Sequence, residues 1–181
     1  FDIVPSLSPA EIIAFLSRPT AGELTLTIPE GFTIFDIDKK IAELGIINGG
    51  EFAAWAEQEH AEGFLFPDTY FVNAAAFDVP SFGGLMKKTF QKKVVTELQK
   101  DLKEAKHTLE EIIIMASILE KEVRHSEDAS MVAGILWKRI DKGWPLQTDA
   151  TSLYGKPDRE ITPAQLREDS PYNTYTRKGL P

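Results

Sequence analysis

The sequence predicts an α+β fold, in which a small portion with one strand between short helices precedes a mostly helical part with long loops. Apolar and polar residues alternate in "LTLTI", residues 24–28, as they do in a half-buried strand. From residue 80 to residue 143 apolar residues recur at helical spacing, and beyond Trp144 the chain becomes polar and rich in turn-forming residues. We therefore expect helices to form the scaffold and the long polar loops to carry ligand contacts.

Start and stop signals bound the helices on either side of this strand. Ser8 followed by proline predicts a helix over residues 9–18. Thr33 as N-cap, with Asp36 at the capping-box position, predicts a second helix that ends at Gly45.

The chain between these helices and Trp144 is predominantly helical by the same criterion. A short helix is expected over residues 51–58, and the aromatic segment 62–72 is expected to form a loop or a short strand. Longer helices are predicted over residues 80–102, 109–123 and 129–143, and a short capped helix begins at Thr162. The first of the long helices is expected to present one apolar side, formed by Phe82, Leu85, Met86, Phe90, Val94 and Leu98.

Charge and composition exclude several functional classes. The 20 Lys and Arg residues face 28 Asp and Glu residues, a net charge of −8, so nucleic acid is not an expected partner. Absence of cysteine excludes disulfides, thiolate metal sites and cysteine nucleophiles. His60, His107 and His125 lack metal-ligand spacing and no phosphate-binding loop is present, so we expect neither a metal nor a cofactor.

The helix predicted over residues 109–123 ends in two carboxylates. Thr108 and Glu111 form a capping box that fixes its start. At about 100° per residue, Glu120 and Glu122 point about 200° apart and cannot both face one cleft.

Apolar neighbours distinguish these two glutamates. Leu119, Ile118 and Met115 precede Glu122 at helical spacing, whereas the residues at the same spacing before Glu120 are Ser117, Ala116 and Ile113. A carboxyl group desolvated in this way has a raised pKa and stays protonated near neutrality, as a general acid must. On the helix alone the alternative stays open, in which both glutamates are solvent-exposed and paired with neighbouring cations.

Four segments carry a family resemblance: "EGFLFPDTYFV", "MASILEKEV", "LQTDATSLYG" and "SPYNTYTRKGLP". In this order and spacing they resemble the signature segments of the endolytic murein transglycosylases, the MltG/YceG-like family. The resemblance implies that residues 1–58 are part of a LysM-like region and that residues 59–181 are most of a lysozyme-like catalytic domain. Because the chain begins at Phe1 and stops at "KGLP", we expect both ends to be cut, with the catalytic domain truncated at its C-terminal end.

The resemblance implies a reaction and a catalytic residue. The family cleaves the β-1,4 bond between N-acetylmuramic acid and N-acetylglucosamine and leaves a 1,6-anhydro end without consuming water. One carboxyl group suits this chemistry, as a general acid first and a base afterwards. Registering the family's pattern on this helix selects Glu122, but Val123 stands where Thr or Ser is expected, so Glu120 is kept in reserve.

The other segments are expected to bind the sugar. Gln147, Thr148 and Asp149 are expected to hydrogen-bond the sugar, and Asp149 is also expected to stabilise positive charge at the anomeric carbon. Further aromatic, amide and hydroxyl groups suited to acetamido sugars come from Tyr172, Asn173, Thr174 and Tyr175. The opposite wall is expected to contain Phe64, Phe66, Pro67, Asp68 and Tyr70. Ordinary loop packing or turn capping is the alternative for each of these residues.

Partners and location follow from the resemblance. It implies peptidoglycan glycan strands as substrate, cell-wall synthases as further partners, and a position on the extracytoplasmic face of the bacterial membrane. Since no run of roughly 20 apolar residues is present, we expect a membrane-anchoring helix only upstream of Phe1. Two other functions stay open, namely a noncatalytic glycan-binding module and a lysozyme-like hydrolase that pairs Glu122 with Asp149 or Asp68.

Overall fold

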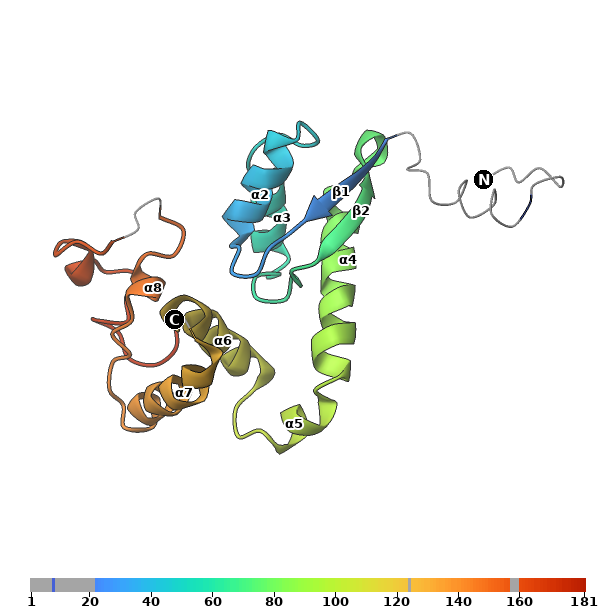
Figure 1. Cartoon of the computed structure of the whole chain (residues 1–181). Helices are drawn as coiled ribbons and strands as arrows, with labels where there is room; N and C mark the ends of the chain where they lie inside the picture. Colours follow the sequence, from blue (N-terminus) through green and yellow to red (C-terminus); the bar gives the residue numbers. More distant parts are fainter. Residues whose placement is uncertain (1–7, 9–21, 124, 157–159) are drawn as a thin grey trace.

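The computed structural model describes residues 8, 22–123, 125–156 and 160–181, and its elements confirm an α+β fold (Figure 1). Strands β1 (Glu23–Thr27) and β2 (Thr69–Asn73) pair antiparallel. The helices are α2 (Ile34–Glu43), α3 (Glu51–Gln58), α4 (Val79–Phe90), α5 (Gln99–Glu104), α6 (Leu109–Glu122), α7 (Ser126–Asp141) and α8 (Asp149–Ser152). A π-helical segment spans Gln91–Thr96, and 3-10 turns span Ala74–Ala76 and Gln165–Arg167. The helix expected over residues 9–18 lies outside the described residues.

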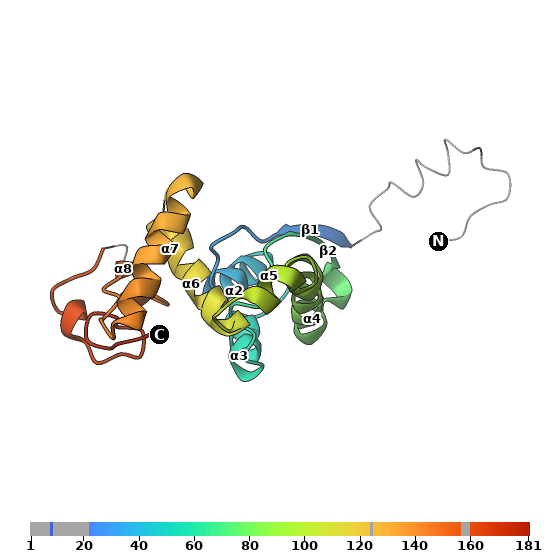
Figure 2. The same cartoon turned by 90° about the horizontal axis from the view of Figure 1, so that it is seen from below.

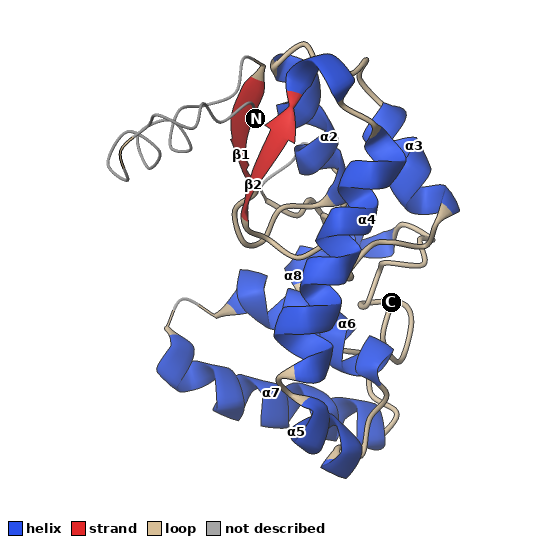
Figure 3. Ribbon diagram, turned by 90° about the vertical axis from the view of Figure 1, so that its right-hand side faces the viewer, coloured by secondary structure: helices blue, strands red, loops and turns tan. Residues whose placement is uncertain are grey.

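The sheet packs with α2, α3 and α4 into a first unit with its own apolar core (Figure 3). Leu26 of β1 lies opposite Tyr70 of β2, and both side chains are buried in this core. The period-two strand predicted at residues 24–28 is thereby confirmed, and the aromatic segment supplies its partner strand. The core residues are Leu26, Ile28, Ile34, Ile37, Ile41, Phe52, Ala56, Ala61, Tyr70, Val72, Phe82 and Met86.

Carboxylates organise the starts of α2 and α3. Thr33 and Asp36 form the predicted capping box of α2. Helix α3 begins after Gly50, which has a φ of 92° and no side chain to cap the helix. The buried carboxylate of Asp38, on α2, accepts hydrogen bonds from the N–H groups of Gly50, Phe52 and Ala53, at 2.7, 2.8 and 3.2 Å. Helix α2 therefore caps α3 from a distance, because unpaired N–H groups at a helix start need acceptors.

The long helix expected over residues 80–102 is divided into α4, the π-helical segment and α5. Each π-helical hydrogen bond spans one more residue than an α-helical bond, so side chains beyond the segment change their direction. Leu85, at the edge of the predicted apolar stripe, is 43% exposed, and Leu98, beyond the π-helical segment, is 46% exposed. The prediction of one apolar side is confirmed for Phe82, Met86 and Phe90 and wrong for these two leucines.

Helices α6, α7 and α8 with the C-terminal loops form a second unit, which Figure 2 shows beside the first. Its core contains Met115, Ile118, Leu136 and Leu146. The capping box of Thr108 and Glu111 at the start of α6 is confirmed. Helix α7 stops at Asp141, close to the predicted stop at Gly143, which has a φ of 64°.

Strand β2 and helix α4 share the first core, and the second core is formed by residues from α6 onward. The domain boundary expected after residue 58 stays a prediction. The LysM-like and lysozyme-like designations of the two parts stay predictions. Within the described ranges, no helix combines the length and apolar character that crossing a membrane requires.

Candidate functional site

The carboxylate of Glu122 lies against the short helix α8. Glu122 is the last residue of α6, and its Oε1 accepts a hydrogen bond from the N–H of Ala150 at 3.4 Å. Ala150 lies at the start of α8, where N–H groups have no partner within the helix. This contact joins residues 28 positions apart in the sequence and sets Glu122 beside Asp149.

Glu120 points to a different part of the molecule. A Cβ built on Gly31 would lie 3.6 Å from Cγ of Glu120 and 3.2 Å from Nζ of Lys121. Lys121 also donates a hydrogen bond to the Gly31 carbonyl at 2.7 Å. Glu120 therefore faces the turn after β1, whereas Glu122 faces α8. This confirms the prediction that the two glutamates point in different directions.

Asp149 is held by Tyr175, whose phenol donates a hydrogen bond to Oδ1 of Asp149. This hydrogen bond, partial burial and the negative charges of Asp149 and Glu122 raise the pKa of Tyr175 to about 12, against a smaller opposing effect of Arg139. The phenol therefore keeps its proton and acts as a donor at physiological pH. Glu122, Asp149 and Tyr175 form what we call the carboxylate site.

Three buried threonines fix the loops beneath the carboxylate site. The hydroxyl oxygens of Thr148, Thr151 and Thr174 lie 2.9 to 3.2 Å apart. The N–H of Thr148 also donates to the Thr174 hydroxyl at 3.1 Å. Thr148 and Thr174 are thus interior residues that place Asp149 next to Tyr175, rather than side chains open to a ligand as we expected.

Asn173 has a similar interior position. It is 1% exposed, and its amide nitrogen donates to the carbonyls of Gln165, Leu166 and Glu168 at 3.1, 3.3 and 2.7 Å. Its amide oxygen accepts from the N–H of Tyr175 at 3.0 Å. The expected sugar contact of Asn173 is not available in this structure, because its polar atoms already hold the loop that carries Tyr175.

Arg139, which no sequence pattern singled out, supports Gln147. The exposed Gln147 has a φ of 55°, a left-handed conformation that costs energy for a residue with a side chain. The Arg139 guanidinium donates to the Leu146 carbonyl at 2.5 Å and, at 3.5 Å, to Oε1 of Gln147. Its position in the last turns of α7 offered no motif, since charged residues are common near helix ends.

The aromatic segment expected to form the opposite wall belongs to the first unit. Tyr70 is buried there and donates to the Phe66 carbonyl at 2.6 Å. Asp68 pairs with Lys93 at 2.8 Å, and this partner holds the pKa of Asp68 below its usual range. Lys93 also lies 5.1 Å from the centre of the Phe66 ring.

This segment also lies beside the beginning of α6. A Cβ on Gly63 would approach Cγ2 of Ile113 to 2.8 Å. Glu122 follows nine residues later, roughly 13 Å along the helix. The polar and cation–π partners of Phe66, Asp68 and Tyr70 lie within the first unit, and none of them belongs to the carboxylate site.

The desolvation expected for Glu122 is absent from the structure. Met115 and Ile118 are buried in the second core, but Glu122 itself is exposed. Helix α6 ends at Glu122, and Val123 continues the chain in an extended conformation. Asp149 is exposed as well, so both carboxylates are open to a ligand.

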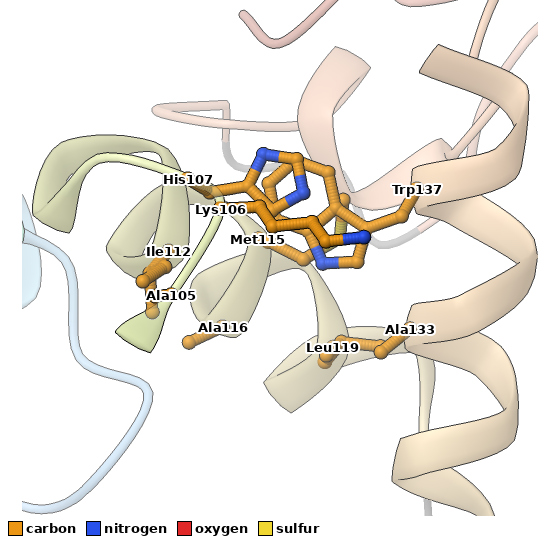
Figure 4. A pocket seen from close by; sticks show the side chains of 9 residues that line it. All are labelled: Ala105, Lys106, His107, Ile112, Met115, Ala116, Leu119, Ala133 and Trp137. Carbon is orange, nitrogen blue, oxygen red and sulfur yellow. The ribbon is translucent and has the colours of Figure 1, made fainter. Parts of the chain in front are cut away.

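A separate hollow of about 390 Å³ lies between α6, α7 and the segment before α6 (Figure 4). The stacked rings of His107 and Trp137, with centres 3.6 Å apart, close one side of it. None of the three residues of the carboxylate site lines it. Among the described residues, no three His, Asp or Glu side chains gather as a metal site requires.

An exposed glutamate at a helix end, beside a second carboxylate held by a tyrosine, defines a site that can exchange protons with a bound ligand and oppose positive charge on it. On this α+β scaffold the chain matches the YceG-like family over residues 1–181, and it belongs to that family.

Individual relatives agree with this membership. An endolytic murein transglycosylase from Bacillus subtilis is 36% identical over 121 residues, which are 66% of this chain and 33% of the relative. A protein of the same name from Streptococcus pneumoniae is 25% identical over 99% of this chain and 40% of its own length. The crystal structure of a YceG-like protein from Listeria monocytogenes superimposes with a TM-score of 0.73 and 28% identity, covering 98% of this chain and 67% of that one. The chain thus spans a third to two fifths of the curated relatives it matches.

Proposed function

We propose that this chain carries the cleaving site of a peptidoglycan lytic transglycosylase. Two of the relatives above are named endolytic murein transglycosylases, and the carboxylate site has the groups that such chemistry needs. The observation that carries the proposal is the hydrogen bond from Ala150 to Glu122, because it sets one glutamate of α6 beside Asp149 and Tyr175. The substrate would be a glycan strand of the cell wall, outside the cytoplasmic membrane, where cell-wall synthases are the partners that the resemblance implies.

In this proposal Glu122 performs both proton transfers. Protonated Glu122 donates its proton to the oxygen of the β-1,4 bond between N-acetylmuramic acid and N-acetylglucosamine, and that bond breaks. The resulting carboxylate then accepts the proton of the C6 hydroxyl of the same muramic acid ring, whose oxygen attacks the anomeric carbon. A 1,6-anhydro ring forms, and no water is consumed.

Asp149 has the supporting role in this scheme. Its carboxylate opposes the positive charge that develops at the anomeric carbon, and the neutral phenol of Tyr175 fixes its orientation. Because Glu122 is exposed in the free protein, a bound strand must supply the desolvation that favours its protonated form.

The products test the proposal directly. Uncrosslinked glycan strands incubated with the chain are expected to yield fragments with 1,6-anhydro ends, which mass spectrometry separates by the mass of one water molecule from reducing ends. Reducing ends would instead identify a hydrolase. That second candidate has an observation in its favour, since Asp149 beside Glu122 provides the second carboxylate that hydrolysing glycosidases use. Strand binding without cleavage by the native chain would favour the noncatalytic module.

Removing the phenol of Tyr175 is expected to slow cleavage. Tyr175→Phe keeps the half-buried ring but leaves Asp149 without its donor, so the carboxylate loses its fixed orientation. A hydrogen bond to a charged group contributes about 1.5–3 kcal/mol, and at this exposed site we expect a loss of about tenfold in rate. Initial rates of fragment release measure it, and an unchanged rate would remove Tyr175 and its hydrogen bond from the mechanism.

A further inference from the structure

Three aromatic rings form a continuous row where the first and second units meet. Phe35 of α2 lies 6.2 Å, between ring centres, from Tyr154, which follows α8. Tyr154 in turn lies 4.9 Å from Tyr172. We call these residues the aromatic ridge.

The ridge is open to solvent at both ends. Phe35 is 41% exposed and Tyr172 is 42% exposed, while Tyr154 between them is half-buried. Gly155 has a φ of 69°, and a Cβ there would lie 3.2 Å from the Phe35 ring, so the absence of a side chain allows this ring to approach the loop. Contiguous exposed apolar surface, rather than single scattered residues, is what marks binding sites on protein surfaces.

The ridge is continuous with the carboxylate site. Tyr154 follows the single turn of α8 whose Ala150 N–H binds Glu122. Tyr172 precedes Tyr175, whose phenol binds Asp149. The two segments that carry Asp149 and Tyr175 therefore also carry Tyr154 and Tyr172 of the ridge, and Phe35 adds a ring from the first unit.

We propose that the aromatic ridge binds a pyranose ring of the glycan strand away from the bond that is cut. This inference rests on the proposed function and adds a binding site to which the first unit contributes through Phe35. Axial C–H groups on one face of a pyranose pack on a flat aromatic ring, and the acetamido and hydroxyl groups around the sugar's edge remain in water. An exposed Phe or Tyr ring supplies the apolar surface for such a contact.

The test is the affinity of uncrosslinked glycan strands for the Glu122→Gln chain, measured by calorimetry so that no strand is cut. Adding Phe35→Leu keeps an apolar side chain against Tyr154 but removes the flat ring, and we expect affinity to fall about threefold to tenfold. Phe35→Trp restores a flat ring and is expected to restore binding. Tyr172→Ala, at the other end of the ridge, is expected to weaken binding by a similar factor.

Phe71 provides a matched control in the same unit. It is 72% exposed on β2 and has no part in the ridge, so Phe71→Ala is expected to leave strand affinity unchanged. Equal affinity of the Phe35→Leu and parent chains, or equal weakening by Phe71→Ala, would overturn the proposal. A parent chain that binds no strand would overturn it too, whereas the proposed function is judged separately, from the anhydro ends that the native chain produces.

Discussion

Replacing Glu122 by glutamine is expected to abolish the release of anhydro-ended fragments, with a loss of about a hundredfold to ten-thousandfold in rate. Glutamine keeps the size of the side chain and can still accept the hydrogen bond from Ala150, but it can neither donate nor accept the proton that the reaction moves. Since Glu122 is exposed, the substitution should leave the fold intact.

Glu120→Gln is the matched control for this experiment. Both glutamates are exposed on the last turn of α6, but Glu120 faces the turn at Gly31 rather than α8. The Glu120 variant is therefore expected to cleave strands at close to the native rate. Loss of cleavage in the Glu120 variant alone would transfer the acid role to that residue, and native cleavage by both variants would refute a catalytic role for either.

Adding one methyl group at Gly83 is expected to destabilise the first unit by about 1–3 kcal/mol. Gly83 is buried in α4 where that helix crosses α3, and a Cβ there would lie only 1.9 Å from Cη2 of Trp55. The Trp55 ring packs against Phe52, with ring centres 5.6 Å apart. To admit the methyl group, the indole must move away from this contact or the two helices must separate.

The neighbouring glycine offers the control. Gly84 lies in the same helix, is exposed, and has no atom within 4 Å of its built Cβ. Gly84→Ala should be neutral or stabilising by up to about 1 kcal/mol, because alanine loses less conformational entropy in a helix. Urea unfolding of the two variants measures both effects. Equal unfolding free energies for them would show that Trp55 yields without cost and that the contact does not limit packing.

Local sequence signals were sufficient where an element depends on its own residues. The capping boxes at Thr33 and Thr108 mark the starts of α2 and α6, because cap and acceptor lie three residues apart and need nothing from the rest of the chain. The period-two strand was clear for the same reason. The division of the long helix at Gln91 could not be predicted, because a π-helical segment leaves no distinct pattern of apolar residues.

The candidate site depends on a different kind of information. The helical angle between Glu120 and Glu122 showed from sequence that they point apart, but which of them meets a second carboxylate depends on where α8 lies. Thr148, Asn173 and Thr174 are buried because they make hydrogen bonds within and between the C-terminal loops. Their residue types would be equally suitable for binding a sugar, so their burial could not be predicted from sequence.

Sequence alone was sufficient for the α+β class, the capped starts of α2 and α6, the family and the short set of carboxylates from which an acid could come. Packing in three dimensions was needed to show that Glu122 joins Asp149 and Tyr175, that Asp68 pairs with Lys93 elsewhere, and that Phe35 meets Tyr154. Helix propensity and capping act between residues a few positions apart. A site, in contrast, is formed by packing that joins distant segments, and its energy is spread over many contacts that no local pattern encodes.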